Sequence, residues 1–186
     1  MIGGNVFARL RRSERAHSNA FRRIGSGNPP RVDARAPLGT WITLVDGEIV
    51  VNHVPFVLDS SRGPLGALFA HVARANPVWK SFSTTVSSVV VFQGVESYIS
   101  PSWYPSKQAH GKAVPTWNYV TVHARGIHIV GIEIPIRALR GKWKTSQNRS
   151  PPDRHGVVDG LRAKGDHAAR EMAELVARRI ELEAQP

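Results

Sequence analysis

The chain has 186 residues, the usual length of one domain, and its 41% hydrophobic and 21% charged residues are typical of a globular protein. It contains no cysteine, which excludes disulfide bonds, thiolate nucleophiles and thiolate-bound metals. No apolar run is long enough for a transmembrane helix, so we expect no membrane partner. The formal net charge of +11 favours partners that carry phosphate groups.

A basic leader opens the chain. Residues 1–35 contain eight arginines against Glu14 and Asp33, which is more than half of the net charge of +11. Apolar periodicity is weak there, so we expect a solvated leader without a fixed structure, and contact with nucleic acid is the alternative. The Gly-Ser-Gly-Asn-Pro-Pro stretch predicts a linker, which divides the chain into a leader over 1–36 and a folded domain over 37–186.

The first predicted elements of the domain are strands. β-rich runs on both sides of Asp46-Gly47 predict a hairpin over 38–51, because both turn residues tolerate a positive φ. Pro55 confines the next run to a sheet edge or a bulge, and another strand is expected over 66–73. Asn76 and Pro77 then form a helix-start signal.

The second half of the domain is also predicted to form strands, followed by a helix at its C-terminal end. Strands are predicted over 88–93, 97–100 and 118–124, with a proline-framed loop over 101–107. The apolar positions change phase within 126–136, which predicts a bulge or tight bend at Val130-Gly131. Helical spacing after Asp166 predicts a C-terminal amphipathic helix. The fold class is therefore mainly β, a small barrel or sandwich with short helices rather than a parallel α/β sheet.

Common catalytic motifs are missing from the sequence. There is no nucleophile elbow, no phosphate loop ending in Gly-Lys-Ser/Thr, no GxGxxG and no HExxH. The eight histidines lack the paired spacing of a metal site. We therefore predict no catalytic residue and no bound metal.

Three stretches combine groups that bind anions or flat rings. His71, Arg74 and Asn76 precede a helix start, where free amides and a guanidinium favour a phosphate, although Asn76 can also serve only as a cap. The stretches 102–107 and 116–119 place aromatic rings beside hydroxyl, amide and ammonium groups, which suits a flat heterocycle or else packing at a barrel rim. The basic, amide-rich stretch 141–149 either closes over a phosphate or is a surface strand end.

Seven strings occur in an order that resembles one known family. They are APLGTWITL, VNHVPFVLD, HVARANPVW, VVFQGVESYISPSWYPSK, HGKAVPTWNYVTVH, GIEIPI and GKWKTSQNR. Together they resemble the PaiB family of FMN-binding negative transcriptional regulators, from about Pro37 to Gly156. The resemblance implies an FMN-binding split barrel related to that of pyridoxamine-phosphate-oxidase-like flavoproteins. It also implies a homodimer with FMN near the subunit interface, and the lack of cysteine favours the reducing cytoplasm.

The same resemblance implies which residues of this chain line the FMN pocket. The first set is His53, His71, Arg74, Asn76, Ser102, Tyr104, Lys107, Thr116, Trp117 and Asn118. A second set is Lys144, Gln147, Asn148 and Arg149.

The chain departs from the family pattern in ways that leave its function open. The family has a helical excursion between the strand after TWNY and the GIEIPI strand, and here residues 126–136 run on without it. The leading function is an FMN-binding regulator that lowers transcription. An FMN-dependent oxidoreductase of the same fold and a homologue that no longer binds flavin are the alternatives.

Overall fold

The computed structural model describes residues 38–129 and 132–184, and in that part the protein consists mainly of strands. The predicted leader and the Val130-Gly131 bend lie outside the described residues. The strands are β1 (Leu38–Val45), β2 (Glu48–Pro55), β3 (Val57–Asp59), β4 (Ala67–Ala70), β5 (Ser88–Ile99), β6 (Thr116–Gly126) and β7 (Ile132–Lys144). The helices are α1 (Val78–Ser81), η2 (Pro101–Trp103), α2 (Pro105–His110), α3 (Pro151–Lys164) and α4 (His167–Ala184).

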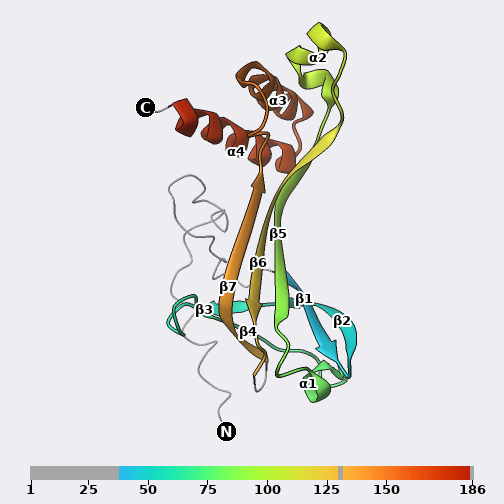
Figure 1. Ribbon diagram of the computed structural model, residues 1–186, viewed down its shortest axis with the longest axis vertical. Helices are drawn as coiled ribbons and strands as arrows, with labels where there is room; N and C mark the ends of the chain where they lie inside the picture. The colour runs from blue at the N-terminus through green and yellow to red at the C-terminus, as the bar shows by residue number, and fades with distance from the viewer. Residues whose placement is uncertain (1–37, 130–131, 185–186) are drawn as a thin grey trace.

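The strands form a seven-stranded antiparallel sheet in the order β2-β1-β5-β6-β7-β4-β3. It curls into a half-barrel, which confirms the mainly β prediction and is consistent with a split barrel. The long strands β5, β6 and β7 run between two ends of the molecule (Figure 1). We call the end with β1, β2, β3, β4 and α1 the hairpin end, and the end with η2, α2, α3 and α4 the helical end.

The predicted hairpin is confirmed. Asp46 and Gly47 have φ angles of 51° and 86°, which are the positive values that a tight two-residue turn requires. Val45 pairs with Glu48, and the ladder continues without a break to Leu38 opposite Pro55. Pro55 ends β2, which is an edge strand, so its missing amide does not interrupt a ladder.

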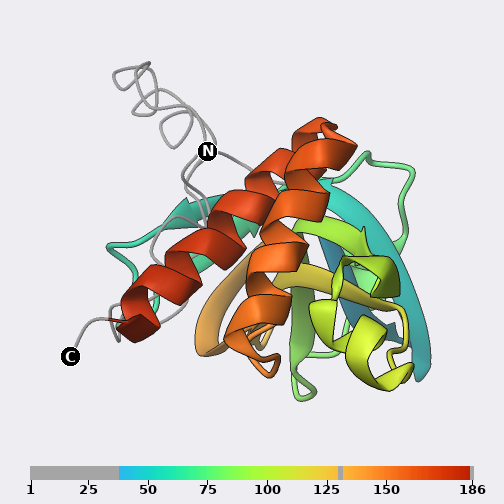
Figure 2. The same ribbon diagram turned by 90° about the horizontal axis from the view of Figure 1, so that it is seen from above.

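Each end of the molecule has its own hydrophobic core. At the hairpin end, side chains from one face of the sheet pack around Trp41, Phe56 and Leu68, which are fully buried. At the helical end, Leu161 of α3 and Met172 of α4 belong to one core with Ile99, the last residue of β5. The helices cross over that end of the sheet (Figure 2).

Helix α3 was not predicted, although its capping signals are present in the sequence. The Ser150 hydroxyl accepts a hydrogen bond from the Asp153 amide, and two prolines occupy the first turn. A Cβ on Gly156 would lie 2.0 Å from the Trp103 carbonyl oxygen, and one on Gly160 would lie 2.2 Å from the Trp103 ring. Tertiary packing against η2 therefore requires two glycines that weaken the helical pattern in sequence.

The C-terminal helix α4 and its cap are confirmed. The Asp166 carboxylate accepts a hydrogen bond of 2.7 Å from the Ala169 amide, and Met172, Ala173 and Val176 are buried on one stripe. Among residues 38–129 and 132–184, no helix is both long and apolar enough to cross a membrane.

Several predicted boundaries need correction. The strand expected over 66–73 is only Ala67–Ala70, and the strands expected over 88–93 and 97–100 form one strand, β5, with a register shift between Gln93 and Glu96. The loop expected over 101–107 contains η2 and the start of α2, because prolines can begin helices as well as break them.

The chain reverses direction between β6 and β7. Ile129 pairs with Glu133 in the antiparallel sense, and its amide donates to the Glu133 carbonyl at 2.9 Å. Ile129 therefore lies before this reversal, whereas Ile132, Ile134 and Ile136 lie after it on β7.

The sheet has an inner and an outer face. Trp41, Val90 and Val122 point inward into the core, whereas their neighbours in the chain point outward. Helices α3 and α4 cover the inner face at the helical end, where Lys164 reaches Ser97. Across β2, β1, β5, β6 and β7 the outer side chains form rows that the register defines, such as His53, Thr40, Val91, His123 and Arg140.

Candidate functional site

The residues that the sequence singled out fall into two groups at opposite ends of β5. His53, His71, Arg74 and Asn76 belong to the hairpin end. The other ten, Ser102, Tyr104, Lys107, Thr116, Trp117, Asn118, Lys144, Gln147, Asn148 and Arg149, belong to the helical end. The register places His53 level with Val91 and Trp117 level with Tyr98, and Asn76 reaches β2 one residue before His53. At 3.2–3.4 Å per residue, the groups are about 25 Å apart along the strands.

At the hairpin end, Asn76 joins the start of α1 to the sheet. Its side-chain amide donates to the Asn52 side-chain oxygen at 2.7 Å, and its own side-chain oxygen accepts from the Val78 amide at 3.0 Å. The cap predicted from the sequence is therefore present.

The predicted cradle of free backbone amides at this helix start needs correction. The Asn76 amide donates to the Ala73 carbonyl at 2.8 Å, Pro77 has no amide hydrogen, and the Val78 amide donates to Asn76. Helix α1 has only four residues, so its dipole contributes little. An anion at this end would depend on side chains instead.

Those side chains are at the surface. His53, His71 and Arg74 are exposed, and the Arg74 carbonyl accepts a hydrogen bond of 3.2 Å from the Trp79 indole. His53 lies on the outer face of β2, whereas Asn52 lies on the inner face. The side-chain nitrogen of Asn52 is buried without a hydrogen-bond partner, which makes Asn52 a polar group of this end that sequence reasoning missed.

Two exposed aromatic rings meet on the outer face at the helical end. Tyr98 and Trp117 are directly paired on β5 and β6, with ring centroids 6.0 Å apart in an edge-to-face arrangement. They retain 40% and 49% of their accessible surface, so each ring can still accept a stacked ligand. Tyr98 was missed as a site residue, because its place beside Trp117 follows from strand pairing.

Ammonium and hydroxyl groups lie on the segments that adjoin these strands. The Lys144 ammonium donates to the Thr116 hydroxyl at 2.5 Å, which anchors the end of β7 to the start of β6. The exposed Ser102 hydroxyl is 2.7 Å from that of Ser100, and Lys107 is exposed on α2.

Two predicted pocket residues lie inside the fold. Asn118 is fully buried, and its side chain exchanges hydrogen bonds with the Ser146 hydroxyl at 3.0 and 3.3 Å. Tyr104 is 1% exposed, with the Arg149 guanidinium 4.6 Å from its ring centroid. Burial raises the pKa of the Tyr104 hydroxyl, and the charge of Arg149 partly opposes that shift. Both residues can support the surface residues of the site only from within the fold.

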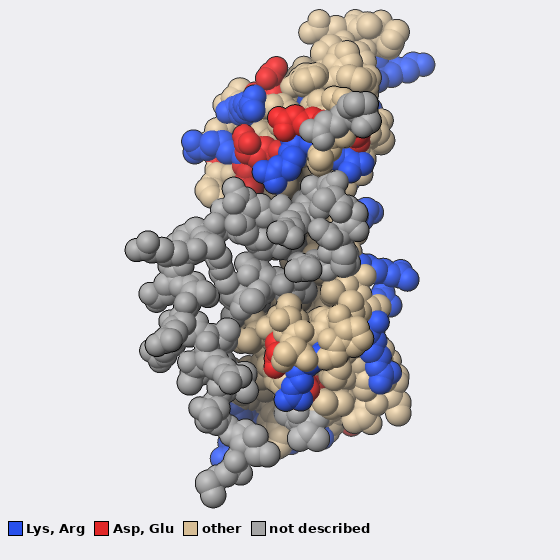
Figure 3. Space-filling view, turned by 90° about the vertical axis from the view of Figure 1, so that its left-hand side faces the viewer, with Lys and Arg blue, Asp and Glu red and all other residues tan. Residues whose placement is uncertain are grey.

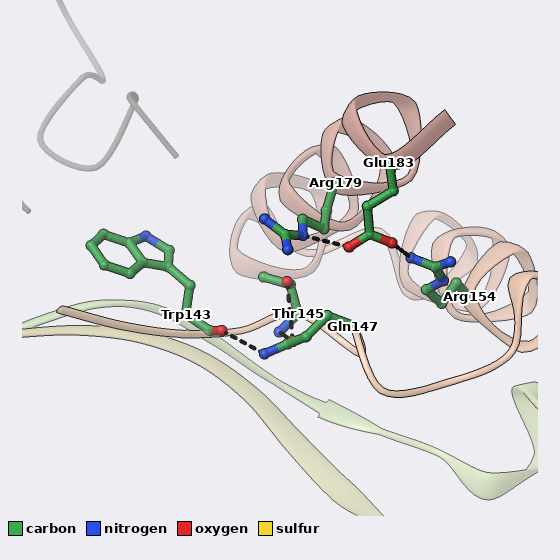
Figure 4. A network of polar contacts seen from close by, with 6 residues as sticks. All are labelled: Trp143, Thr145, Gln147, Arg154, Arg179 and Glu183. Atoms are coloured by element: carbon green, nitrogen blue, oxygen red, sulfur yellow. Dashed lines mark hydrogen bonds and ion pairs between the residues drawn. The ribbon is translucent and has the colours of Figure 1, made fainter. Parts of the chain in front are cut away.

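The loop after β7 is held by its own hydrogen bonds. The Gln147 side-chain oxygen accepts from the Thr145 amide at 2.8 Å, and its nitrogen donates to the Trp143 carbonyl at 3.1 Å (Figure 4). Asn148 is exposed beside it. Figure 4 also shows Arg154 of α3 and Arg179 of α4 pointing toward Glu183, which ties the two helices together.

Asp153 attaches α2 to α3. Its carboxylate accepts hydrogen bonds from the Ser106 amide at 3.0 Å and from the Ser106 hydroxyl at 2.7 Å. Burial raises the pKa of this carboxyl, but the hydrogen bonds from Ser106 and Ser150 outweigh burial and hold the pKa below its ordinary value of 3.8.

Charge is distributed unevenly between the sheet and the two C-terminal helices. Residues 97–150, which contain the end of β5, all of β6 and β7 and the segments that connect them, have eight Lys and Arg against a single acid, Glu133. Helices α3 and α4 contain six Lys and Arg against six Asp and Glu, and Figure 3 shows both signs interspersed over them. The excess positive charge therefore belongs to the sheet.

The donor set suits a flat ring that carries a phosphate. Exposed aromatic faces with nearby hydroxyl and ammonium groups lie at the helical end, and an exposed guanidinium with two imidazoles lies at the hairpin end. Within the described part of the chain, no three His, Asp or Glu side chains gather to hold a metal ion. The arrangement can bind a ring at one end and an anion at the other.

Comparison with known proteins agrees with this chemistry. A protein of Bacillus subtilis, "Protease synthase and sporulation protein PAI 2", is 26% identical over 181 residues, which cover 74% of this chain and 84% of that protein. An uncharacterized protein of Emericella nidulans is 28% identical over 225 residues, covering 78% and 90%. An uncharacterized protein of Saccharomyces cerevisiae is 40% identical over 81 residues, covering 44% and 48%.

The aligned stretch with the Bacillus subtilis protein is longer than the part of this chain that it covers. The relative therefore has segments without a counterpart here, as expected if an internal excursion is missing. The family model described as "Putative FMN-binding domain" matches residues 30–183, nearly the whole described chain. The chain is thus a PaiB-like protein of the FMN-binding domain family, with FMN as the family's cofactor.

Proposed function

We propose that the protein is a homodimer in which each FMN lies between the hairpin end of one copy and the helical end of the other. The observation that carries the proposal is the separation of the two residue groups. Arg74 and Trp117 belong to groups about 25 Å apart along the strands, more than one FMN molecule spans. A single copy therefore offers two half-sites.

A two-fold axis near the middle of β5 would bring opposite ends of two copies together. Such an axis creates an isologous interface, in which each half-site of one copy meets the complementary half-site of its partner. At the hairpin end, β2 also has apolar side chains for a dimer to bury, since Ile49 and Val51 are 73% and 52% exposed.

The residues present assign a role to each half-site. Trp117 and Tyr98 would stack on the flavin ring, with Thr116 and Lys144 beside its polar edge. Arg74 of the other copy would pair with the phosphate through charge-assisted hydrogen bonds. Bound FMN supplies a redox-active ring, and the protein contributes its orientation and its shielding from water.

Regulation of transcription is the function that we attach to this flavin site. Its support is the likeness to the PaiB family of negative transcriptional regulators and the excess of cations over residues 97–150. A flavin-dependent oxidoreductase is the alternative, and NAD(P)H-dependent turnover by the purified protein would favour it over a regulator.

A mixing experiment tests the composite site. Arg74→Ala and Trp117→Ala chains each lack one half-site, so each variant alone should bind FMN weakly. If the site lies between copies, unfolding and refolding the two together should restore about a quarter of the sites, because each mixed dimer has one intact site. A site within one chain predicts no recovery, since every chain in the mixture is then defective.

The absorbance spectrum and the molecular mass complete the test. Purified protein should show flavin absorbance, and its mass in solution should be that of two chains. A monomer that binds FMN tightly would contradict the shared site, and a dimer that takes up no flavin would contradict the cofactor.

A further inference from the structure

Two cations on the outer face of β7 have no role in the proposed flavin site. Arg140 is directly paired with His123 and Lys142 with Thr121, so all four side chains lie on the outer face. Arg140 and Lys142 are both exposed and occupy successive outer positions of the strand, about 7 Å apart. Two cations at that spacing can each pair with one of two linked phosphate groups.

An aromatic ring lies beside these cations. The Lys142 ammonium is 5.7 Å from the centroid of the Tyr119 ring, and Tyr119 is two residues from Trp117 on the same face of β6. Aromatic faces that alternate with cations are the groups with which proteins bind nucleotide bases and phosphates. We call Tyr119, Thr121, Arg140 and Lys142 the β6–β7 strip.

The charges of the strip are not neutralised by neighbouring acids. Among the ion pairs of residues 38–129 and 132–184, none involves Arg140 or Lys142. The acid of the adjoining row, Glu96, instead accepts a hydrogen bond of 2.6 Å from Gln93. An anionic ligand would therefore meet cations without displacing an existing ion pair.

We infer that the β6–β7 strip binds a second nucleotide, one with at least two phosphate groups, beside the flavin. The inference rests on the proposed function, because it places the flavin at Trp117 and the second nucleotide at the next positions of the same face. The base stacks near Tyr119, and the phosphates pair with Arg140 and Lys142. The alternative is that the strip is only a solvated strand surface whose cations prevent edge pairing. Such a surface would not select a nucleotide with a base and two phosphates.

ADP binding to FMN-saturated protein, measured by calorimetry, tests the inference. ADP should bind more tightly than either adenosine or pyrophosphate, because each of these lacks half of the contacts. The double variant Arg140→Gln with Lys142→Gln should lose at least tenfold in ADP affinity, as expected for two charge-assisted contacts. The matched control, Arg162→Gln with Arg170→Gln, removes the same charge from exposed positions on α3 and α4 and should bind ADP like the parent.

Each outcome supports or overturns the inference. Equal ADP affinity of the two double variants would overturn it, as would displacement of FMN by ADP, since the strip would then be part of the flavin site. Single-stranded oligothymidylate that binds far more tightly than ADP and loses affinity in the Arg140/Lys142 variant would overturn it in favour of nucleic acid.

FMN titration of the same samples separates this inference from the flavin proposal. If the parent binds ADP with the expected dependence on Arg140 and Lys142 but takes up no FMN, the flavin proposal fails and the strip stands as a nucleotide site. If FMN binds and ADP does not, the flavin proposal stands and the inference fails.

Discussion

The two ends of β5, β6 and β7 differ in what they pack against and in what they expose. At the hairpin end the inner face is closed by other strands around Trp41, and the outer face shows aliphatic side chains such as Ile49. At the helical end two helices close the inner face, and the outer face shows Trp117 and Lys142. The same three strands thus join an apolar surface to an aromatic and basic one.

This difference is the reason for proposing that a single chain is an incomplete flavin site. The guanidinium that suits a phosphate and the rings that suit a heterocycle lie at opposite ends, and long antiparallel strands keep them apart. In the proposed dimer, a second copy would bring unlike ends together without any change in the strands.

The largest expected effect is on the helical end. Gly156→Ala would place a Cβ 2.0 Å from the Trp103 carbonyl oxygen, so η2 and α3 must move apart. We expect the free energy of unfolding to fall by about 3 kcal/mol, the upper range for overpacking, as measured by urea denaturation. Asp159→Ala on the exposed side of α3 is the control and should change stability little. Equal stability of the two variants would show that the close packing of α3 on Trp103 is not required.

The second effect concerns the hairpin end. Arg74→Ala should weaken FMN by roughly ten- to a hundredfold, because charge-assisted hydrogen bonds contribute about 1.5–3 kcal/mol. Quenching of flavin fluorescence measures this affinity. Riboflavin, which lacks the phosphate, should distinguish the variant from the parent far less. Lys80→Ala tests a nearby exposed cation on α1, and an equal loss there would mean that only local charge matters.

A third prediction uses pH to probe the helical end. Asp153→Asn should lower the free energy of unfolding by about 1–3 kcal/mol at neutral pH, because the carboxylate accepts two hydrogen bonds from Ser106. The folded-state pKa of Asp153 lies below its ordinary value of 3.8, so this contribution is complete above that pH. It is lost as the pH falls through the folded-state pKa.

Urea denaturation of parent and variant from pH 7 to pH 3 provides the test. The difference in stability should stay constant down to about pH 5 and shrink below pH 4. A difference that grows with acidity would mean that the carboxyl is stabilised in its protonated form.

The smallest effect is expected from deletion of residues 1–36. The flavin site is proposed from residues of the folded domain, so FMN affinity should remain that of the full chain. Any affinity for DNA in low salt should fall on deletion, because eight arginines are removed and phosphate contacts dominate such binding. A footprint on one promoter that survives both deletion and moderate salt would point to base-specific recognition by the domain.

Local signals in the sequence determined the parts of the fold that depend on neighbouring residues. Asp46-Gly47 specified a hairpin, Asn76 specified a cap, and Asp166 specified the start of α4, since each acts within four residues of itself. The ordered motifs also determined the family and its cofactor.

Only the tertiary structure decided how those motifs are arranged in space. Helix α3 was missed because its two glycines serve contacts with Trp103, which is distant in sequence. The contacts of Asn52 with Asn76 and of Tyr98 with Trp117, and the burial of Tyr104, depend on strand pairing and packing between distant parts of the chain. The separation of the two residue groups follows from strand register, which the hydrogen bonds between strands fix and no local motif contains.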